Sequence, residues 1–364
     1  MAGHGKEHFI SAYQLFSVLF IGRIIILVTI NSGLAGNENF SDLIAASLWM
    51  FLATFVMVIP LWLLTRKRPA LNILDQGYYL LGRVGIILPV FYAIYFVSVN
   101  WYYLSVFQLF SANVMDPRTP AWVIAAAVLV VACYGAYKGV EAIVRTAGII
   151  LVLICAGTIF MICSLFFKMD AGNFEPMFYE GAGGSLYGAI LFLCRSSSIS
   201  VMALLLPIVK GKRKLGFSIW NLGVWLVMTV VFLIMIGVAG DFLKMQIFPL
   251  YTVTAMAELG PFQRLDAVFL GVWLTGLFIK IAMDLYLVSL CVTRFLGEKA
   301  GRISILAGAA VTGIVAQLAM GSRELQALFF GPWLFFPITL TAAFLIPLFL
   351  LLMDKIQSKR RAGK

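Results

Sequence analysis

Long apolar segments, separated by short polar stretches, recur along almost the whole chain. A helix needs about 20 mostly apolar residues to cross a bilayer. The segments that meet this requirement cover residues 10–34, 42–64, 85–111, 120–137, 140–166, 185–209, 216–240, 266–290, 303–319 and 328–353. The pattern predicts an all-α integral membrane protein with ten transmembrane helices. Two amphipathic stretches, 70–84 and 248–260, predict short helices that either lie in the membrane interface or simply connect spans.

The composition supports a membrane protein and argues against several other classes. Hydrophobic residues make up 62% of the chain and charged residues 12%, whereas a soluble domain is about 25% charged. The five cysteines form no C-x-x-C pair, and both histidines lie in the N-terminal tail, so neither a disulfide framework nor a metal site is predicted. No nucleophile–base set, catalytic carboxylate pair or phosphate loop is present, so neither an enzyme nor a cofactor is expected.

The basic residues are distributed asymmetrically among the loops. If the N-terminus is cytoplasmic, most of the 27 lysines and arginines fall in cytoplasmic segments, as the positive-inside rule requires. This predicts that the N- and C-termini are both cytoplasmic, with a basic cytoplasmic tail at 354–364. Membrane topology therefore accounts for the net charge of +11, and membrane lipid, not nucleic acid, is the expected partner.

Ten spans divide into two sets of five, which predicts a 5+5 inverted repeat. The expected organisation is one membrane domain, 1–364, with a first five-helix repeat at 1–166 and a second at 185–353. The motif L-F-x-x-R occurs at 19–23 in span 1 and again at 191–195 in span 6. Such a short match in apolar sequence also arises by chance. In transporters with inverted repeats, however, equivalent helices are broken where they form the substrate site, so spans 1 and 6 are predicted to be broken.

Polar residues within the apolar segments are the candidates for function. A basic side chain at the centre of a span costs about 2.5–3.5 kcal/mol on insertion scales and usually faces the protein interior. Arg195, followed by three serines, lies near the middle of span 6 and either meets a ligand carboxylate, acts as a gate, or forms a structural ion pair or carbonyl clamp. Arg23 in span 1 has the same alternatives. The candidate ligand-binding residues are Gly22, Arg23, Asn100, Cys194, Arg195, Ser196, Ser197, Ser198 and Lys280.

Span 8 carries Lys280 and, four residues later, Asp284, which are the candidate coupling residues. Lys280 is expected to be the deeper of the two and to serve as a proton carrier or as a fixed charge that replaces a bound cation. Asp284 is expected to lie at the cytoplasmic interface. The alternative is an ordinary i,i+4 pair that stabilises its helix by about 0.2–0.5 kcal/mol. In span 3, Asn100 and the aromatic residues 101–103 either line a pocket or pack.

Several stretches together resemble a known family. They are "ISAYQLF" at 10–16, "TPAW" at 119–122, "YGAYKGVEAIVRTAGI" at 134–149 and "FPLYTVTAMAELGPFQRLDAVFLGVWLTGLFIK" at 248–280. The chain resembles, over nearly its full length, the B-subunit of bacterial spore germinant receptors, which are permease-like proteins of the amino acid–polyamine–organocation superfamily. Residues that match its span-8 pattern are Arg264, Asp266, Phe269, Trp273 and Lys280, and those that match its link between spans 4 and 5 are Glu141 and Arg145.

The resemblance implies a transporter-like fold in the spore inner membrane and detection of a small germinant, often an amino acid. It also implies a complex with an A-type subunit that bears a soluble domain and with a C-type lipoprotein. The link residues are expected to be structural or cytoplasm-facing. The chain departs from the family in having Ser197-Ser198 where many members have Gly-Glu, and in lacking their glycine-rich break in span 1. Two other functions stay open: a proton-coupled amino-acid transporter and a ligand-free assembly subunit.

Overall fold

The computed structural model describes residues 9–29, 40–115, 118–175, 182–257, 266–320, 322, 325 and 331–362. These residues are helical apart from turns and one pair of two-residue strands, which confirms the all-α prediction. Strands β1 (Ile10–Ser11) and β2 (Val209–Lys210) pair in parallel, with Ile10 opposite Val209.

The helices of the described residues occur in the following order. Up to residue 174 they are α1 (Ala12–Ile24), the 3₁₀ segment η1 (Ile25–Thr29), α3 (Asp42–Lys67), α4 (Ile73–Leu81), the 3₁₀ segment η2 (Gly82–Ile86), α5 (Ile87–Phe110), the π-helical η3 (Ser111–Met115), α6 (Ala121–Lys138), α7 (Val140–Leu165), and the 3₁₀ segments η4 (Phe166–Lys168) and η5 (Ala171–Phe174). From there on they are α8 (Ala182–Cys194), α9 (Ser198–Leu205), η6 (Leu206–Ile208), α10 (Arg213–Ala239), η7 (Gly240–Met245), α11 (Pro249–Ala255), α12 (Asp266–Leu296), α13 (Glu298–Met320), α15 (Pro332–Leu340), the π-helical η8 (Thr341–Leu345) and α16 (Ile346–Ala362).

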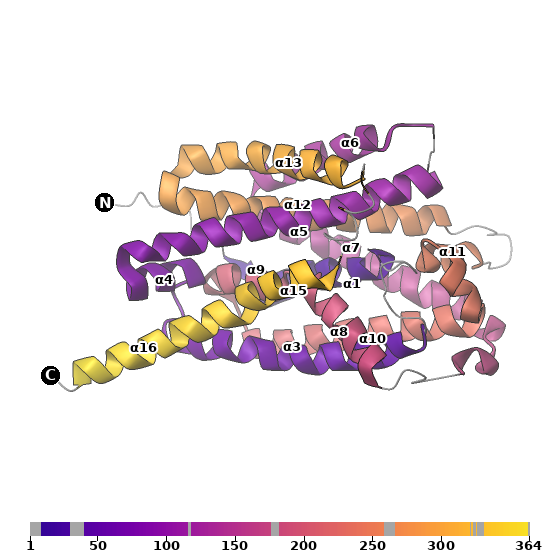
Figure 1. Cartoon of the computed structure of the whole chain (residues 1–364), viewed down its shortest axis with the longest axis horizontal. Helices are drawn as coiled ribbons and strands as arrows, with labels where there is room; N and C mark the ends of the chain where they lie inside the picture. Colours follow the sequence, from indigo (N-terminus) through magenta and orange to yellow (C-terminus); the bar gives the residue numbers. More distant parts are fainter. Residues whose placement is uncertain are drawn as a thin grey trace.

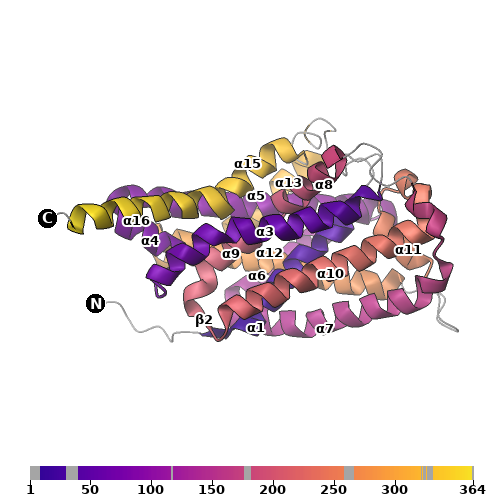
Figure 2. The ribbon, with the colours of Figure 1, turned by 90° about the horizontal axis from the view of Figure 1, so that it is seen from below.

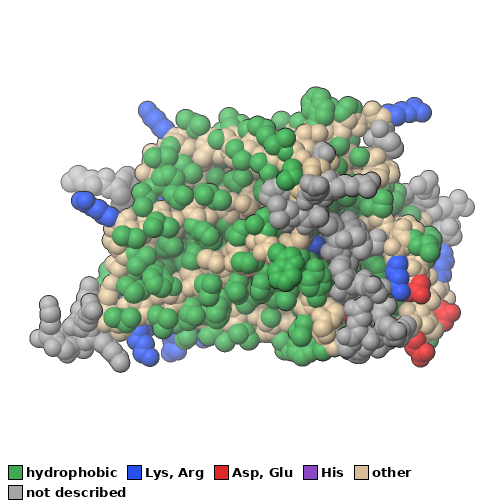
Figure 3. Space-filling view, in the orientation of Figure 1, with side chains coloured by type: hydrophobic (Ala, Val, Ile, Leu, Met, Phe, Trp, Pro, Cys, Tyr) green, Lys and Arg blue, Asp and Glu red, His purple; other side chains and the backbone are tan. Residues whose placement is uncertain are grey.

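Within the described residues, nine helical segments are long and apolar enough to cross a membrane, and Ala12–Val28 forms a shorter apolar helix. Each of the predicted spans overlaps one of these segments. Figures 1 and 2 show most of the long helices running along the long axis of the molecule. In Figure 3 hydrophobic side chains cover the middle of the visible face, while the prominent Lys and Arg side chains lie toward its two ends. This is the surface of an integral membrane protein.

Local sequence signals place several helix ends. Ser11 caps α1 in a capping box with Gln14, at 3.2 and 2.9 Å, which satisfies backbone N–H groups that the first turn leaves free. Asn72 caps α4, the first of the two predicted short helices, and α11 corresponds to the second. Gly139 has φ +88° between α6 and α7, a backbone conformation that favours glycine and lets the chain reverse between consecutive spans.

The segment Ala182–Ile208 is the most buried of the candidate spans, and α9 lies near the centre of the bundle (Figure 1). It is broken between α8 and α9, as predicted. In span 1 the α-helix ends at Ile24 and a 3₁₀ segment follows. Span 1 therefore stays helical from Ala12 to Val28, and the break predicted for it does not occur between these residues. Pairing of β1 with β2 brings the start of α1 beside the end of the α8–α9 segment.

Candidate functional site

The break in the most buried segment lies at Arg195–Ser197, between the end of α8 and the start of α9. Every residue from 191 to 206 is buried. A helix end leaves its last carbonyl groups without partners inside the helix, and a buried carbonyl without a partner costs free energy. The Ser196 amide, for example, donates to Leu193 O at 3.1 Å instead of to Phe192 O. The break is therefore stable only if other groups donate to the freed carbonyls.

Side chains from three other helices supply these donors. Arg23 comes from α1, Tyr95 and Tyr103 come from α5, and Thr339 comes from α15. The bonds are Arg23 Nη1 to Phe192 O at 3.1 Å, Thr339 Oγ1 to Cys194 O at 2.8 Å, Tyr103 OH to Arg195 O at 2.7 Å and Tyr95 OH to Ser196 O at 3.3 Å. The break is thus a junction held by side chains of α1, α5 and α15.

Arg23 has the geometry of a carbonyl clamp. Its side chain is 1% exposed and also donates to Thr54 Oγ1 on α3 at 3.1 Å. Its guanidinium carbon lies 6.0 Å from the centre of the Trp220 ring on α10, within the range of a cation–π contact. One side chain therefore links α1, α3 and α10 to the end of α8, which matches the structural alternative for this residue.

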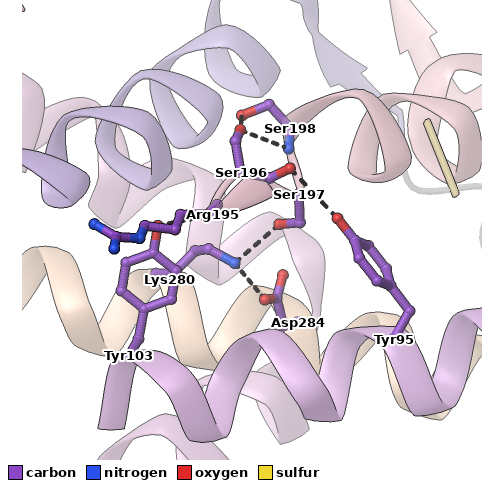
Figure 4. A network of polar contacts seen from close by, with 8 residues as sticks. All are labelled: Tyr95, Tyr103, Arg195, Ser196, Ser197, Ser198, Lys280 and Asp284. Atoms are coloured by element: carbon purple, nitrogen blue, oxygen red, sulfur yellow. Dashed lines mark hydrogen bonds and ion pairs between the residues drawn. The ribbon is translucent and has the colours of Figure 1, made fainter. Parts of the chain in front are cut away.

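Lys280 joins the break to α12. Its ammonium donates to Ser197 Oγ at 2.9 Å and forms an ion pair with Asp284 Oδ2 (Figure 4). Lys280 is 5% exposed and Asp284 is 0% exposed. The prediction that Asp284 lies at the cytoplasmic interface is therefore wrong: it is buried and neutralises Lys280. Its second oxygen, Oδ1, has no hydrogen-bond partner among the described residues.

Gly22 and Tyr103 border the lysine side chain. A Cβ atom added to Gly22 would lie 3.3 Å from Lys280 Cδ, so glycine lets α1 approach α12 closely at this point. The Lys280 ammonium lies 5.2 Å from the centre of the Tyr103 ring. The structure thus brings together four predicted site residues: Gly22, Ser197, Lys280 and Asp284.

Other predicted residues lie at the break but face different groups. The Arg195 guanidinium points away from the Lys280 ammonium (Figure 4) and lies over the Tyr102 ring at 5.4 Å. Ser196 Oγ donates to Ser198 Oγ at 3.0 Å, which stiffens the turn locally. Cys194 Sγ contacts Leu191 O, in its own helix, at 3.2 Å. The backbone carbonyl of Arg195 therefore takes part in the junction, while its guanidinium lies on the side that faces away from Lys280.

Asn100 is fully buried in α5, and neither polar atom of its amide has a hydrogen-bond partner among the described residues. Of the residues matched through the resemblance, Arg264 lies outside the described residues, as does the side chain of Asp266. Phe269 and Trp273 line an apolar cavity. Glu141 and Arg145 form an exposed i,i+4 ion pair at the start of α7, as expected for structural link residues.

Of the four donors that hold the break, sequence reasoning singled out Arg23 and missed the other three. Tyr95 and Thr339 were not candidates, and Tyr103 was considered only as part of an aromatic stretch. The available signal is the spacing of Tyr95 and Tyr103, because residues about two turns apart lie on one face of a helix. That face can be recognised as a donor face only once α5 is known to pack against the break.

The arrangement is a buried, electrically neutral pair of opposite charges beside unwound backbone. No group of three or more His, Cys, Asp or Glu that could hold a metal ion occurs in the described part of the chain. The site can offer an ammonium to an anionic group, and it can offer Asp284 Oδ1, which has no hydrogen-bond partner among the described residues, to a cationic group.

Comparisons with known proteins identify a family and a fold. Residues 9–325 match the family described as "Spore germination protein". Among solved structures, a Na⁺-coupled sialic acid symporter in a substrate-bound, outward-open state superposes with a TM-score of 0.63 at 14% sequence identity. The match covers 92% of this chain and 79% of the symporter, so the two share a transporter fold. A search of curated protein sequences finds no significant match.

Proposed function

The chain belongs to the spore germination protein family, and from this premise we propose that it is the germinant-sensing membrane subunit of a spore germination receptor. The germinant, an amino acid in this proposal, binds at the junction of spans 1, 3, 6 and 8, where α1, α5, the α8–α9 break and α12 meet. The observation that carries the proposal is the buried Lys280–Asp284 pair bonded to Ser197 in the break.

The charges of this pair complement a zwitterion. An amino acid presents a carboxylate and an ammonium a few ångströms apart, opposite in sign to the two charges of the site. Its carboxylate binds the Lys280 ammonium, and its ammonium binds Asp284 Oδ1, which has no partner among the described residues. A buried carboxylate oxygen without a partner is costly, so a ligand that supplies a donor there gains affinity.

The hydrogen bond between Lys280 on α12 and Ser197 in the break also provides a way to transmit a signal. In the ligand-free arrangement Lys280 holds Ser197 at 2.9 Å. A ligand carboxylate that binds the Lys280 ammonium breaks this hydrogen bond to Ser197. The equilibrium between two arrangements of the break then shifts toward the arrangement that binds the ligand more tightly. Side chains of α1, α5 and α15 also bond to the break, so its movement is transmitted to these helices.

The proposal extends to the architecture and the setting of the protein. It includes ten spans in a 5+5 inverted repeat, and the proximity of α1 to the end of the α8–α9 segment supports a pairing of the first and sixth spans. It places the protein in the spore inner membrane with both termini cytoplasmic. Its partners are an A-type subunit with a soluble domain and a C-type lipoprotein, which receive the signal.

Germination of variant spores tests the function. The double substitution Lys280→Met with Asp284→Leu removes both charges together, so it leaves no unpaired buried charge. We expect the variant to accumulate at the wild-type level and to lose its response to amino acids, L-alanine included. The control applies Arg145→Met with Glu141→Leu to the exposed pair of the same spacing, and should respond normally. An unchanged dose–response in the Lys280/Asp284 variant refutes the site.

Arg195 is tested separately because its guanidinium lies apart from the pair. We expect Arg195→Ala to abolish the germinant response while the protein still accumulates, since the side chain packs over Tyr102 next to the break and fixes the position of the Arg195 carbonyl. A normal dose–response in this variant would exclude Arg195 from both ligand binding and gating.

A proton-coupled amino-acid transporter is the second candidate, favoured by the buried Lys280–Asp284 pair in a fold shared with a symporter. Purified protein in liposomes distinguishes the two functions. Uptake of amino acids that varies with pH in wild type and disappears in Lys280→Ala supports transport. Absence of uptake at every pH, together with a normal germinant response in spores, removes the transporter and leaves the receptor.

A further inference from the structure

A cavity of about 350 Å³ lies among α1 with η1, α7, α10, α11 and α12. Its wall includes Ile25, Val28, Met161, Val231, Trp273 and Gly276. Its volume is within the range of about 300–1,000 Å³ that is typical of small-molecule sites. It is separate from the Lys280–Asp284 pair, because neither residue lines it.

The lining has almost no free polar groups. Thr158 and Thr254 each donate a hydroxyl to a carbonyl of their own helix, both at 2.8 Å. The exception is Trp273, which is 5% exposed and whose indole N–H has no hydrogen-bond partner among the described residues. The indole nitrogen itself is covered by neighbouring groups, so it presents no donor to the cavity, and the cavity suits an uncharged apolar molecule.

One side of the cavity is formed by α7, where the lining residues Leu153 and Gly157 are exposed on the surface of the protein. This stretch of α7 belongs to a candidate membrane span, so the membrane interior covers it. A Cβ atom added to Gly157 would meet nothing within 4 Å, which leaves a path beside this glycine. An apolar molecule dissolved in the bilayer can reach the cavity from that side.

We propose that this cavity is a second ligand site, which takes a small, uncharged, mainly aliphatic molecule from the bilayer. Its aliphatic part fills the space between α1 and α7. The alkyl chain of an aliphatic alcohol has this chemistry. The site does not depend on the identity of the germinant.

The cavity and the Lys280–Asp284 pair are connected through the packing of α1 against α12. Gly276 lines it one helical turn before Lys280, and a Cβ atom at Gly276 would lie 3.3 Å from Ile21 Cγ2. Ile21 also lines the cavity and directly precedes Gly22, where an added Cβ atom would lie 3.3 Å from Lys280 Cδ. The two sites therefore share the close contact between α1 and α12, and an occupant of the cavity shifts the germinant dose–response.

Photolabelling of the full chain in liposomes tests the site with 3-azioctanol, an alcohol that carries a photoreactive diazirine. We expect the label to concentrate on cavity residues such as Met161, and excess octanol to displace it. Gly157→Phe fills the cavity and should reduce this labelling more than tenfold. Gly271→Phe is the matched control, because Gly271 is an exposed helical glycine that also has no neighbour within 4 Å but does not line the cavity.

The apolar character of the site is tested with an azialkane of equal length that lacks the hydroxyl. It should label the same cavity residues as 3-azioctanol, because the lining presents no free donor, and Gly157→Phe should reduce its labelling as well. Labelling spread evenly over the lipid-facing helices, or labelling unchanged in Gly157→Phe, overturns the proposal. Neither result depends on a germinant response, so this failure is distinguishable from failure of the proposed receptor function.

Discussion

Replacing Lys280 alone by methionine leaves the Asp284 carboxylate buried without its cation. Both side chains are at most 5% exposed, and removing one partner of a buried pair costs about 3–5 kcal/mol. Asp284→Leu leaves the Lys280 ammonium uncompensated at a similar cost. The double variant removes both charges, and replacing a buried pair by apolar residues is often neutral. We therefore expect each single variant to lose about 3–5 kcal/mol of stability and the double variant to lose much less than their sum.

The exposed Glu141–Arg145 pair calibrates this measurement. It has the same i,i+4 spacing, but both of its side chains are exposed, so its coupling should be only about 0.2–0.5 kcal/mol. The assay is reversible unfolding of purified protein in mixed micelles by titration with sodium dodecyl sulfate, evaluated as a double-mutant cycle for each pair. Because the Lys280–Asp284 pair is buried, we expect its coupling energy to be several times that of the exposed Glu141–Arg145 pair. The reasoning would be refuted if the losses of stability in the two single variants at Lys280 and Asp284 added up to the loss in the double variant. It would also be refuted if each single variant lost less than about 0.5 kcal/mol.

Three further outcomes follow from the contacts. Gly22→Ala places a Cβ atom 3.3 Å from the Lys280 side chain, so we expect a right-shifted germinant dose–response in spores with normal protein levels. Tyr103→Phe should cost more stability than Tyr95→Phe in the same titration, about 1–3 kcal/mol for an unpaired buried carbonyl, because their bonds to the break measure 2.7 and 3.3 Å. Asp354→Asn weakens two partly exposed ion pairs to the end of α3 and should cost at most about 1 kcal/mol.

The spans could be predicted from sequence because a bilayer leaves few options. Every backbone polar group must be satisfied inside the segment, so a long apolar stretch must be helical. The break could be predicted for a related reason: Arg195 and the serines that follow it are poor occupants of a lipid-facing helix. The free-energy cost of exposing these residues to lipid predicts an irregular segment that is buried inside the protein. The structure has such a segment between α8 and α9.

The burial of Asp284 could not be predicted from the extent of the apolar segment. The predicted span ended at residue 290, whereas α12 continues to Leu296, about 18 Å beyond Asp284 at 1.5 Å per residue. Its burial also depends on neighbours that lie far away in the sequence, such as Ser197. The donors Tyr95 and Thr339 escaped prediction for the same reason, because their role depends on which helix packs against the freed carbonyls.

The position of a bound germinant tests the central claim most directly. A cryo-electron microscopy map of the receptor complex with a saturating amino-acid germinant would reveal it. We expect ligand density beside the α8–α9 break, with the ligand carboxylate at the Lys280 ammonium, the ligand ammonium at Asp284 Oδ1, and Ser197 released from its 2.9 Å bond to Lys280. Germinant density elsewhere in the complex, with the Lys280–Ser197 bond intact, would contradict the account.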